Sequence, residues 1–275
     1  MIPTASNAIL GQAATTAAPT TDAQAFADPI AFVESAASAV PGGLAGTSAP
    51  ITIVLLLTLL TVAPAILILC TSFTRFVVVI GLLRQAIGTQ GLPPSQIVVG
   101  LSLFLTFVAM TPTLDAMWEE GLQPYLDAPV GERDSAAAWE GMKRPLKRFM
   151  VAQIRYDGNE SSLQMMMEFS GWDYERDGDF NPLGDEVGLV QLVPAFVLSE
   201  LKTAFLIAFR IYLPFLVIDM VVSSLLISMG MMMLPPVFVS LPFKLLLFVI
   251  ADGWMLVAGS LMYGVQAASA GAVPF

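Results

Sequence analysis

The stretch LLISMGMMMLPP, residues 225–236, contains four methionines around one glycine and ends on two prolines. Long apolar segments flank it on both sides. Proline lacks a backbone N–H and restricts the residue before it, so Pro235 and Pro236 separate one helix from the next. Gly230 supplies backbone freedom at the same point. The stretch therefore predicts a turn at the tip of a buried pair of apolar helices.

The methionines of this turn have two interpretations. Their side chains are unbranched and rotate about three bonds, so they fill irregular gaps in a core and also mould around a moving ligand. In a pore, the second property would give a deformable seal. The residues alone favour core filling, and the seal remains an open alternative. The side chains concerned are Met229, Met231, Met232 and Met233.

The composition is that of a membrane protein. Hydrophobic residues make up 56% of the 275 residues and charged residues only 12%, against about half and about a quarter in ordinary globular proteins. The net charge of -10 is concentrated between residues 115 and 186, where 16 acidic and 7 basic residues leave -9. Because the 12 Lys and Arg are too scattered to form a basic surface, a nucleic-acid partner is excluded.

Residue types also exclude most enzyme classes. The chain has no histidine, which removes Ser-His-Asp and Cys-His catalysis and His-ligated zinc. The single cysteine, Cys70, lies in an apolar run and is expected to be a small buried hydrophobe. An intramembrane aspartyl protease using Asp219 and Asp252 lacks the sequence motifs that such a site requires. We therefore expect no catalysis, no cofactor and no metal.

Apolar and polar stretches alternate along the chain. Runs at 51–83 and 97–111 predict a first hairpin, and runs at 187–229 and 237–265 a second. Pro194 and Pro214 require the run at 187–229 to be a bent or broken helix. The predicted parts are a low-complexity, disordered N-terminal segment (1–50), a first apolar hairpin (51–114), an acidic polar domain (115–186), a second apolar hairpin with the Met-rich turn (187–265) and a C-terminal tail (266–275).

The two hairpin turns share a pattern. In each, a glycine is followed four residues later by Leu-Pro-Pro, which indicates two related hairpins. The expected hinge residues are Gly88, Pro93, Pro94, Gly230, Pro235 and Pro236. Lys and Arg near the ends of the apolar runs, namely Arg75, Arg84 and Lys244, place both turns on the cytoplasmic side and the acidic domain outside.

The acidic domain is expected to be mostly helical. Residues 136–154 predict one helix, with Pro145 near its first turns, and residues 159–169 predict a second, capped by Asn159 or Ser161. The run DYERDGD at 173–179 begins like a calcium loop, but Gly184 stands where a bidentate Glu is needed. A solvated acidic loop is the favoured interpretation.

Charges inside apolar helices are candidate functional residues, because an unpaired charge in that setting costs at least about 2.5 kcal/mol. They need partners within the chain or in a neighbouring subunit. Fixed ion pairs are the favoured interpretation, while a proton or ion relay, as in a small-ion or solute transporter, is the alternative. The residues are Glu200, Lys202, Arg210, Asp219, Lys244 and Asp252.

Several blocks of sequence, in one order, resemble the FliP family of flagellar export-gate subunits. They are TSFTR at 71–75, LLRQAIGTQ at 82–90, LFLTF at 103–107, PAFVLSELKTAF at 194–205, SMGMMMLPP at 228–236, LPFKLLLF at 241–248 and DGW at 252–254. The resemblance covers residues 51–265. It implies an all-α, membrane-associated subunit without enzymatic activity.

The resemblance also implies an assembly and a site. In this family several copies, usually five, assemble with FliQ and FliR into a helical, conical channel. The channel accepts unfolded flagellar subunits from the FlhA and FlhB platform at the inner membrane. Its helices pack largely on one another above the plane of the membrane lipid. The family's gasket around the pore falls here on Met231, Met232 and Met233, with Met229 beside it.

Overall fold

The computed structural model describes residues 54, 57–58, 60–61, 65, 68–89, 91–129, 133–172, 187–231 and 233–269. The N-terminal segment 1–50, the acidic run 173–186 and Met232 lie outside the described residues. The chain divides into two compact units, Met1–Val62 and Ala63–Phe275, and the helices below belong to the second. All regular elements in the described ranges are helices, which confirms the expected all-α fold.

The first hairpin consists of α4 (Phe73–Ile87) and α5 (Ser95–Met117). Apolar side chains at helical spacing, from Phe76 through Val79 and Ile80 to Leu83, bury one face of α4. Gly88 ends the helix in the left-handed region, with φ at 83°, and its N–H donates to the Gln85 carbonyl.

α5 continues beyond the end of its apolar run. It passes through a π-helical turn, η1 (Trp118–Leu122), into α6 (Gln123–Asp127), so that one helical rod runs from Ser95 to Asp127. The expected boundary between residues 114 and 115 thus falls inside a continuous helix. At η1 the backbone of Gly121 lies against that of Gly141, where an added Cβ on Gly141 would lie 2.2 Å from the Glu120 carbonyl oxygen.

The acidic segment contributes α7 (Ser135–Tyr156) and α8 (Glu160–Phe169). Asp134 caps α7 by accepting from the N–H groups of Ala136 and Ala137. Pro145 lies near the middle of α7, so its expected place in the first turns was wrong.

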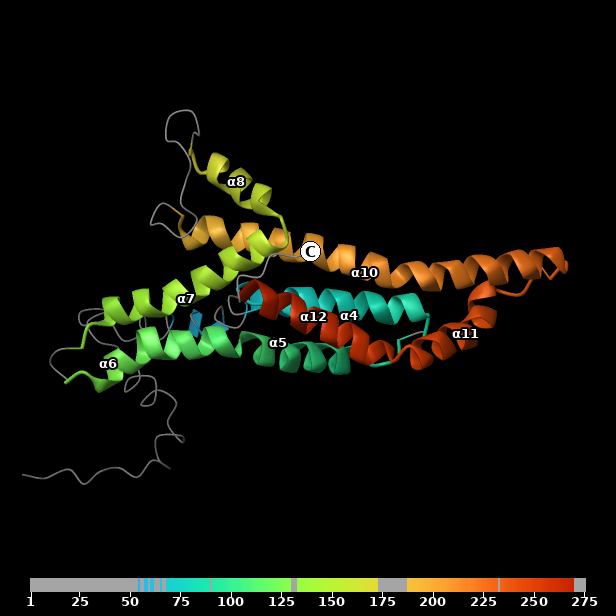
Figure 1. Cartoon of the computed structure of the whole chain (residues 1–275), viewed down its shortest axis with the longest axis horizontal. Coiled ribbons are helices and arrows are strands. Elements are labelled where there is room, and N and C mark those ends of the chain that lie inside the picture. Colours follow the sequence, from blue (N-terminus) through green and yellow to red (C-terminus); the bar gives the residue numbers. More distant parts are fainter. Residues whose placement is uncertain are drawn as a thin grey trace, which may run out of the picture. The chain divides into compact units, whose positions relative to one another are not determined.

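α10 (Leu189–Ser228) is one unbroken helix of 40 residues. Figure 1 shows it as a gently curved rod, so of the two expected outcomes the broken helix is excluded. Pro194 and Pro214 each remove one backbone hydrogen bond, but the rest of the long ladder keeps the helix intact.

The last apolar run, expected as one segment, forms two helices, α11 (Pro236–Ile250) and α12 (Gly253–Ser269), bent by 59°. Asp252 occupies the left-handed region, with φ at 50°, and ends α11. The ring of Phe248 lies where a Cβ of Gly253 would be, 2.1 Å away, so only glycine fits this bend.

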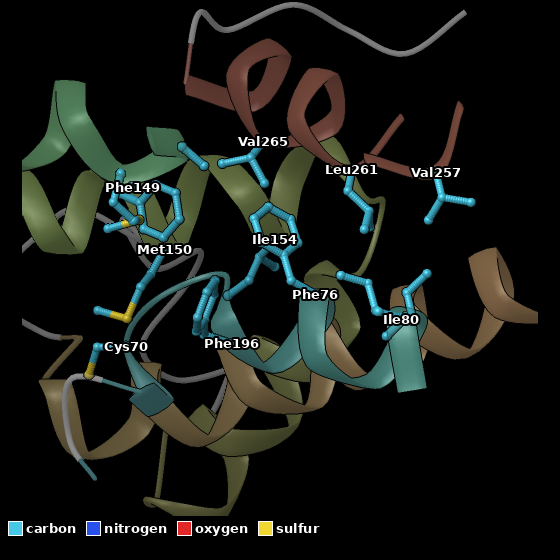
Figure 2. Packing of buried hydrophobic residues seen from close by; sticks show 14 of the residues in the cluster. Cys70, Phe76, Ile80, Phe149, Met150, Ile154, Phe196, Val257, Leu261 and Val265 are labelled. Carbon is cyan, nitrogen blue, oxygen red and sulfur yellow. The ribbon is translucent and has the colours of Figure 1, made fainter. Parts of the chain in front are cut away.

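These helices share one core, part of which Figure 2 shows from close by. Phe76 and Ile80 of α4, Phe196 of α10 and Leu261 of α12 pack in it with α7. Phe149 of α7 meets Phe196 edge to face, with ring centroids 5.8 Å apart. The acidic segment therefore packs onto the apolar helices through a common core.

Two described helical rods, Ser95–Asp127 and Leu189–Ser228, are long and apolar enough to cross a membrane, and the bent pair of α11 and α12 would make a third. In Figure 1 the turn after α4 and the turn after α10 lie toward one end of this unit. Helices α6, α7 and α8 lie toward the other.

Candidate functional site

The methionine turn lies at the end of α10, and its described side chains are not packed into the core of the chain. Gly230 has a φ of 73° and its N–H donates to the Ile227 carbonyl, which closes the helix. The exposed fractions are 70% for Met229, 39% for Met231 and 98% for Met233. These three methionines therefore do not fill the chain's own core, and the favoured expectation was wrong for them. Met232 lies outside the described residues.

The turn after α4 is held against α11. Val237 Cγ1 would lie 3.8 Å from a Cβ on Gly88, and Lys244 Nζ 4.0 Å from it. Arg84 donates to the Pro93 carbonyl at 3.1 Å, and Pro94 precedes the first residue of α5. Gly88 resembles Gly230 in its positive φ. The two glycines of the shared sequence pattern thus end their helices in the same way.

A buried ion cluster joins α4, α7 and α10. Arg75 Nε and Nη2 donate to Glu200 Oε2 and Oε1, both at 2.8 Å, and Nη2 also pairs with Asp157. Arg75 is 1% exposed and Glu200 is fully buried. Such a bidentate pair is the strongest arrangement of a guanidinium and a carboxylate. Gln153, turned so that its amide oxygen faces the guanidinium, accepts from Nη1 and Nη2 at 3.0 Å.

Next to this cluster, Asn159 ties α8 to α10. Its side-chain amide donates to Ser199 Oγ at 3.0 Å and to Thr203 Oγ1 at 3.1 Å. Asn159 occupies the N-cap position of α8, but its side chain makes no cap hydrogen bond, so its expected capping role was wrong. The side chain is turned toward α10, where its Nδ2 group donates to these two hydroxyl groups.

A second ion pair joins α10, α11 and the end of α4. Lys244 Nζ donates to Asp219 Oδ2 at 2.6 Å and to the Ala86 carbonyl at 3.1 Å. Ser240 donates to the other Asp219 oxygen at 2.6 Å. The Lys244 side chain is 4% exposed and that of Asp219 is 29% exposed, so this pair is partly open to its surroundings.

The six charges predicted from the apolar runs therefore divide into two groups. Glu200, Asp219 and Lys244 have partners within the chain. Lys202, Arg210 and Asp252 are exposed, and no salt bridge to any of them occurs in the part of the chain that the structure describes. Asp219, bound to Lys244, is not brought into a carboxylate pair with Asp252, as an aspartyl protease would require.

Several residues of the buried cluster are absent from the sequence-based candidates. Arg75 served there only to indicate orientation, and Gln153 and Asp157 had no assigned role. A lone cation in an apolar run was a usable signal for Arg75, since such a charge must find a partner. No comparable signal marks Gln153 or Asp157, which lie in a polar helix and its end.

No group of three or more His, Cys, Asp or Glu side chains among the described residues is arranged to hold a metal ion. The acidic run that begins like a calcium loop lies outside those residues.

Comparison with known proteins places the chain among flagellar proteins. The FliP family model matches residues 56–261. Flagellar biosynthetic protein FliP of Bacillus subtilis strain 168 is 46% identical over 215 residues, which is 78% of this chain and 91% of that protein. The Caulobacter vibrioides protein of the same name is 44% identical over 242 residues, 88% of this chain and 86% of its own length. The Aquifex aeolicus protein is 45% identical, with 78% and 86% covered.

Proposed function

The chain belongs to the FliP family of flagellar biosynthetic proteins, which are structural components of the flagellar export apparatus and not enzymes, and from that premise we propose that it is a core subunit of a protein-conducting channel. The channel passes unfolded flagellar subunits across the inner membrane. The acidic helices face the periplasm and both hairpin turns face the cytoplasm. FlhA and FlhB deliver the substrates on that side.

The exposed apolar surface of α10 carries this proposal. In the second half of α10, large apolar side chains are exposed on several sides: Leu213, Leu216, Val217, Met220, Val221, Leu225 and Ile227. Contiguous apolar surface of this extent marks an interface with protein or membrane. We assign it to contacts between copies of the chain, five in the ring, and to contacts with FliQ and FliR.

The methionine turn would then lie at the pore. With Met231 and Met233 exposed at the tip of α10, each subunit of a ring would bring Met231, Met232 and Met233 toward the axis, with Met229 beside them. Flexible thioether side chains fill a narrow apolar constriction and exclude water and ions from it. They still rearrange around an extended polypeptide. Gly230, Pro235 and Pro236 hold the turn, and Gly88, Pro93 and Pro94 hold the neighbouring one.

The alternative of a small-ion or solute transporter has less support. Arg75 and Glu200 form a bidentate ion pair. Lys244 donates hydrogen bonds to Asp219 and to a backbone carbonyl. Charges fixed in this way favour structural pairs over a relay.

The seal is tested by shortening Met231, Met232 and Met233 to Ala together. We expect the channel to assemble and export in part, while the cells lose membrane potential, because the constriction is wider and wets. The matched control replaces all three by Leu, a branched side chain of similar volume with fewer ways to rearrange. That variant should stay ion-tight but export poorly. An assembled Ala variant that is ion-tight would overturn the seal.

A further inference from the structure

The second half of α10 and helix α11 form a hairpin with contacts of its own. We call residues 215–250 the outer hairpin. Its two helices are joined by the ion pair of Asp219 with Lys244, at 2.6 Å, and by the rings of Phe215 and Phe248, whose centroids lie 6.4 Å apart. An ion pair and a ring contact at different levels fix the two helices relative to each other. The outer hairpin is therefore a unit that can move without losing its shape.

In α10, the base of the outer hairpin follows a stretch that the chain does not pack. None of residues 209–214 is buried, although Ala208 before this stretch and Phe215 after it are. Pro214 ends the stretch and lacks the N–H that would bond to the Arg210 carbonyl. A helix that lacks a backbone hydrogen bond and is not held by packing bends more easily there than elsewhere. Pro214 is therefore a candidate hinge.

In α11, the base of the outer hairpin meets the bend to α12. Asp252 has a φ of 50°, a conformation that is uncommon for residues other than glycine. Its N–H donates to the Val249 carbonyl and its carbonyl accepts from the Leu256 N–H, both at 3.1 Å, so the hydrogen bonds of the two helices meet at this residue. Across the bend, Phe248 packs edge to face with Trp254, with ring centroids 5.4 Å apart. Packed rings have no fixed hydrogen-bond geometry, so this contact can tilt without breaking.

Both weak points lie at the same end of the outer hairpin, opposite the methionine turn. Pro214 directly precedes Phe215, and Phe248, the ring partner of Phe215, lies four residues before Asp252. Figure 1 shows α10 continuing past the end of α4, with α11 beside it. The outer hairpin therefore projects from the packed helices and is attached to them at its base.

We propose that the outer hairpin turns as one unit about Pro214 and Asp252, and that this turn opens and closes the seal at the methionine turn. From its base to its tip at Ser228 the hairpin is about 20 Å long, so a turn of about 10° moves the tip by about 3 to 4 Å. A turn away from α4 breaks the hydrogen bond of Lys244 to the Ala86 carbonyl, at 3.1 Å, and leaves the contacts inside the hairpin intact. The hinge rests on the proposed channel and names the part of the chain that moves in it.

α10 contains another proline, Pro194, whose surroundings differ. Leu192, Ala195 and Phe196 are buried around it, and the ring of Phe196 meets α7. Pro194 lacks a backbone N–H as Pro214 does, but packing holds the helix in place there. A missing hydrogen bond therefore allows a turn in the second half of α10 and not in the first.

α11 also contains a proline, Pro242, which lies inside the outer hairpin. Ser240 and Lys244, on either side of it, both donate to the Asp219 carboxylate at 2.6 Å. These two hydrogen bonds hold α11 against α10 at the level of Pro242. Substitutions at Pro194 and Pro242 thus provide matched controls for a substitution at Pro214.

Pro214→Ala tests the hinge in the complete export apparatus, in cells that lack the unaltered chain. Alanine supplies the missing N–H and favours the helix, so the variant should fold and assemble normally. We expect the channel to stay ion-tight and the export of flagellar subunits to fall about tenfold, because a stiffer α10 holds the seal closed. Export within about twofold of the unaltered chain would overturn the hinge.

Pro194→Ala and Pro242→Ala make the same chemical change away from the hinge. Both variants should assemble, and both should export to within about twofold of the unaltered chain. An equal fall in all three variants would overturn the hinge and leave the channel proposal standing. Normal export by cells without this chain would overturn the channel proposal as well.

The motion itself is measured with pairs of spin labels on introduced cysteines in the purified full chain, whose natural Cys70 is buried. One pair, Ile227→Cys with Val249→Cys, lies within the outer hairpin, and the other, Ile227→Cys with Tyr263→Cys, joins its tip to α12. All three residues are exposed. We expect the distance distribution of the second pair to be at least about twice as broad as that of the first, and to narrow on Pro214→Ala. Equal widths for the two pairs, or no narrowing, would contradict the hinge.

Discussion

The two halves of α10 are both largely apolar in sequence, but they differ in how much of their surface the chain itself covers. The first half, residues 189–208, buries seven residues and the second half, residues 209–228, buries three. The first half meets α4, α7 and α8 through Glu200, Ser199 and Phe196. The second half meets α11 at Phe215 and Asp219 and leaves most of its apolar side chains exposed. The first half is thus packed by the chain itself, whereas the second half leaves apolar side chains uncovered.

This difference shows what a single chain of an assembly must contain. The packed half lies in the core that it shares with α4, α7 and α8 and carries Glu200 of the buried ion cluster, so contacts within the chain fix its position. The exposed half then projects the methionine turn from that base, supported by one partly exposed ion pair. Substitutions at the packed half should therefore lower the stability of the isolated chain, whereas substitutions at the exposed half should lower the yield of the assembled complex.

The largest expected effect comes from Arg75→Leu. It leaves the carboxylates of Glu200 and Asp157 buried without a cation, and breaking such a pair costs about 3–5 kcal/mol. We expect the chain to be degraded or to unfold easily in mixed micelles. Arg75→Lys keeps the positive charge but cannot form the bidentate pair, so its loss of stability should be smaller than that of Arg75→Leu. A normal level and unfolding curve for Arg75→Leu would contradict the role of the cluster.

Gly141→Ala, at the contact between α7 and η1, should have the next largest effect. Its Cβ would lie 2.2 Å from the Glu120 carbonyl oxygen, which is backbone and cannot turn away. We expect a loss of about 3 kcal/mol in the free energy of unfolding. Gly81→Ala is the matched control, since a Cβ there meets nothing within 4 Å, and it should be neutral or slightly stabilising.

Lys244→Met should lower the free energy of unfolding by less, because the ion pair that it breaks is partly exposed. The Asp219 side chain is 29% exposed and keeps its hydrogen bond from Ser240. We expect a loss of about 1.5 to 2 kcal/mol, as for a hydrogen bond to a charged group. Unfolding of the purified chain measures it. A loss equal to that of Arg75→Leu would show that the two ends do not differ as described.

The smallest effect on the isolated chain is expected in the exposed half. Met220→Ala removes a side chain that is 66% exposed, so the free energy of unfolding should change by less than about 0.5 kcal/mol. The same change should lower the yield of assembled complex, measured by native mass. A large loss of stability without any loss of assembly would reverse the assignment of this surface.

Local patterns predicted the apolar helical segments and the two turns, although not every helix boundary. Apolar runs marked the hairpins, and glycine followed by Leu-Pro-Pro marked the turns at Gly88 and Gly230, because these depend on neighbours in sequence. The break between α11 and α12 was missed, since it depends on Phe248 lying over Gly253. The partnership of Arg75 with Glu200, 125 residues apart, was missed because only the fold brings them together.

The central claim is that the exposed half of α10 and the methionine turn become covered only on assembly. Hydrogen exchange of the full chain, compared between the purified subunit in detergent and the complete complex, measures this directly. Backbone amides of residues 209–231 should exchange at least about tenfold more slowly in the complex, while those of residues 192–208 should be equally protected in both. Equal protection of the two halves in the isolated chain, or no gain at residues 209–231 on assembly, would contradict the account.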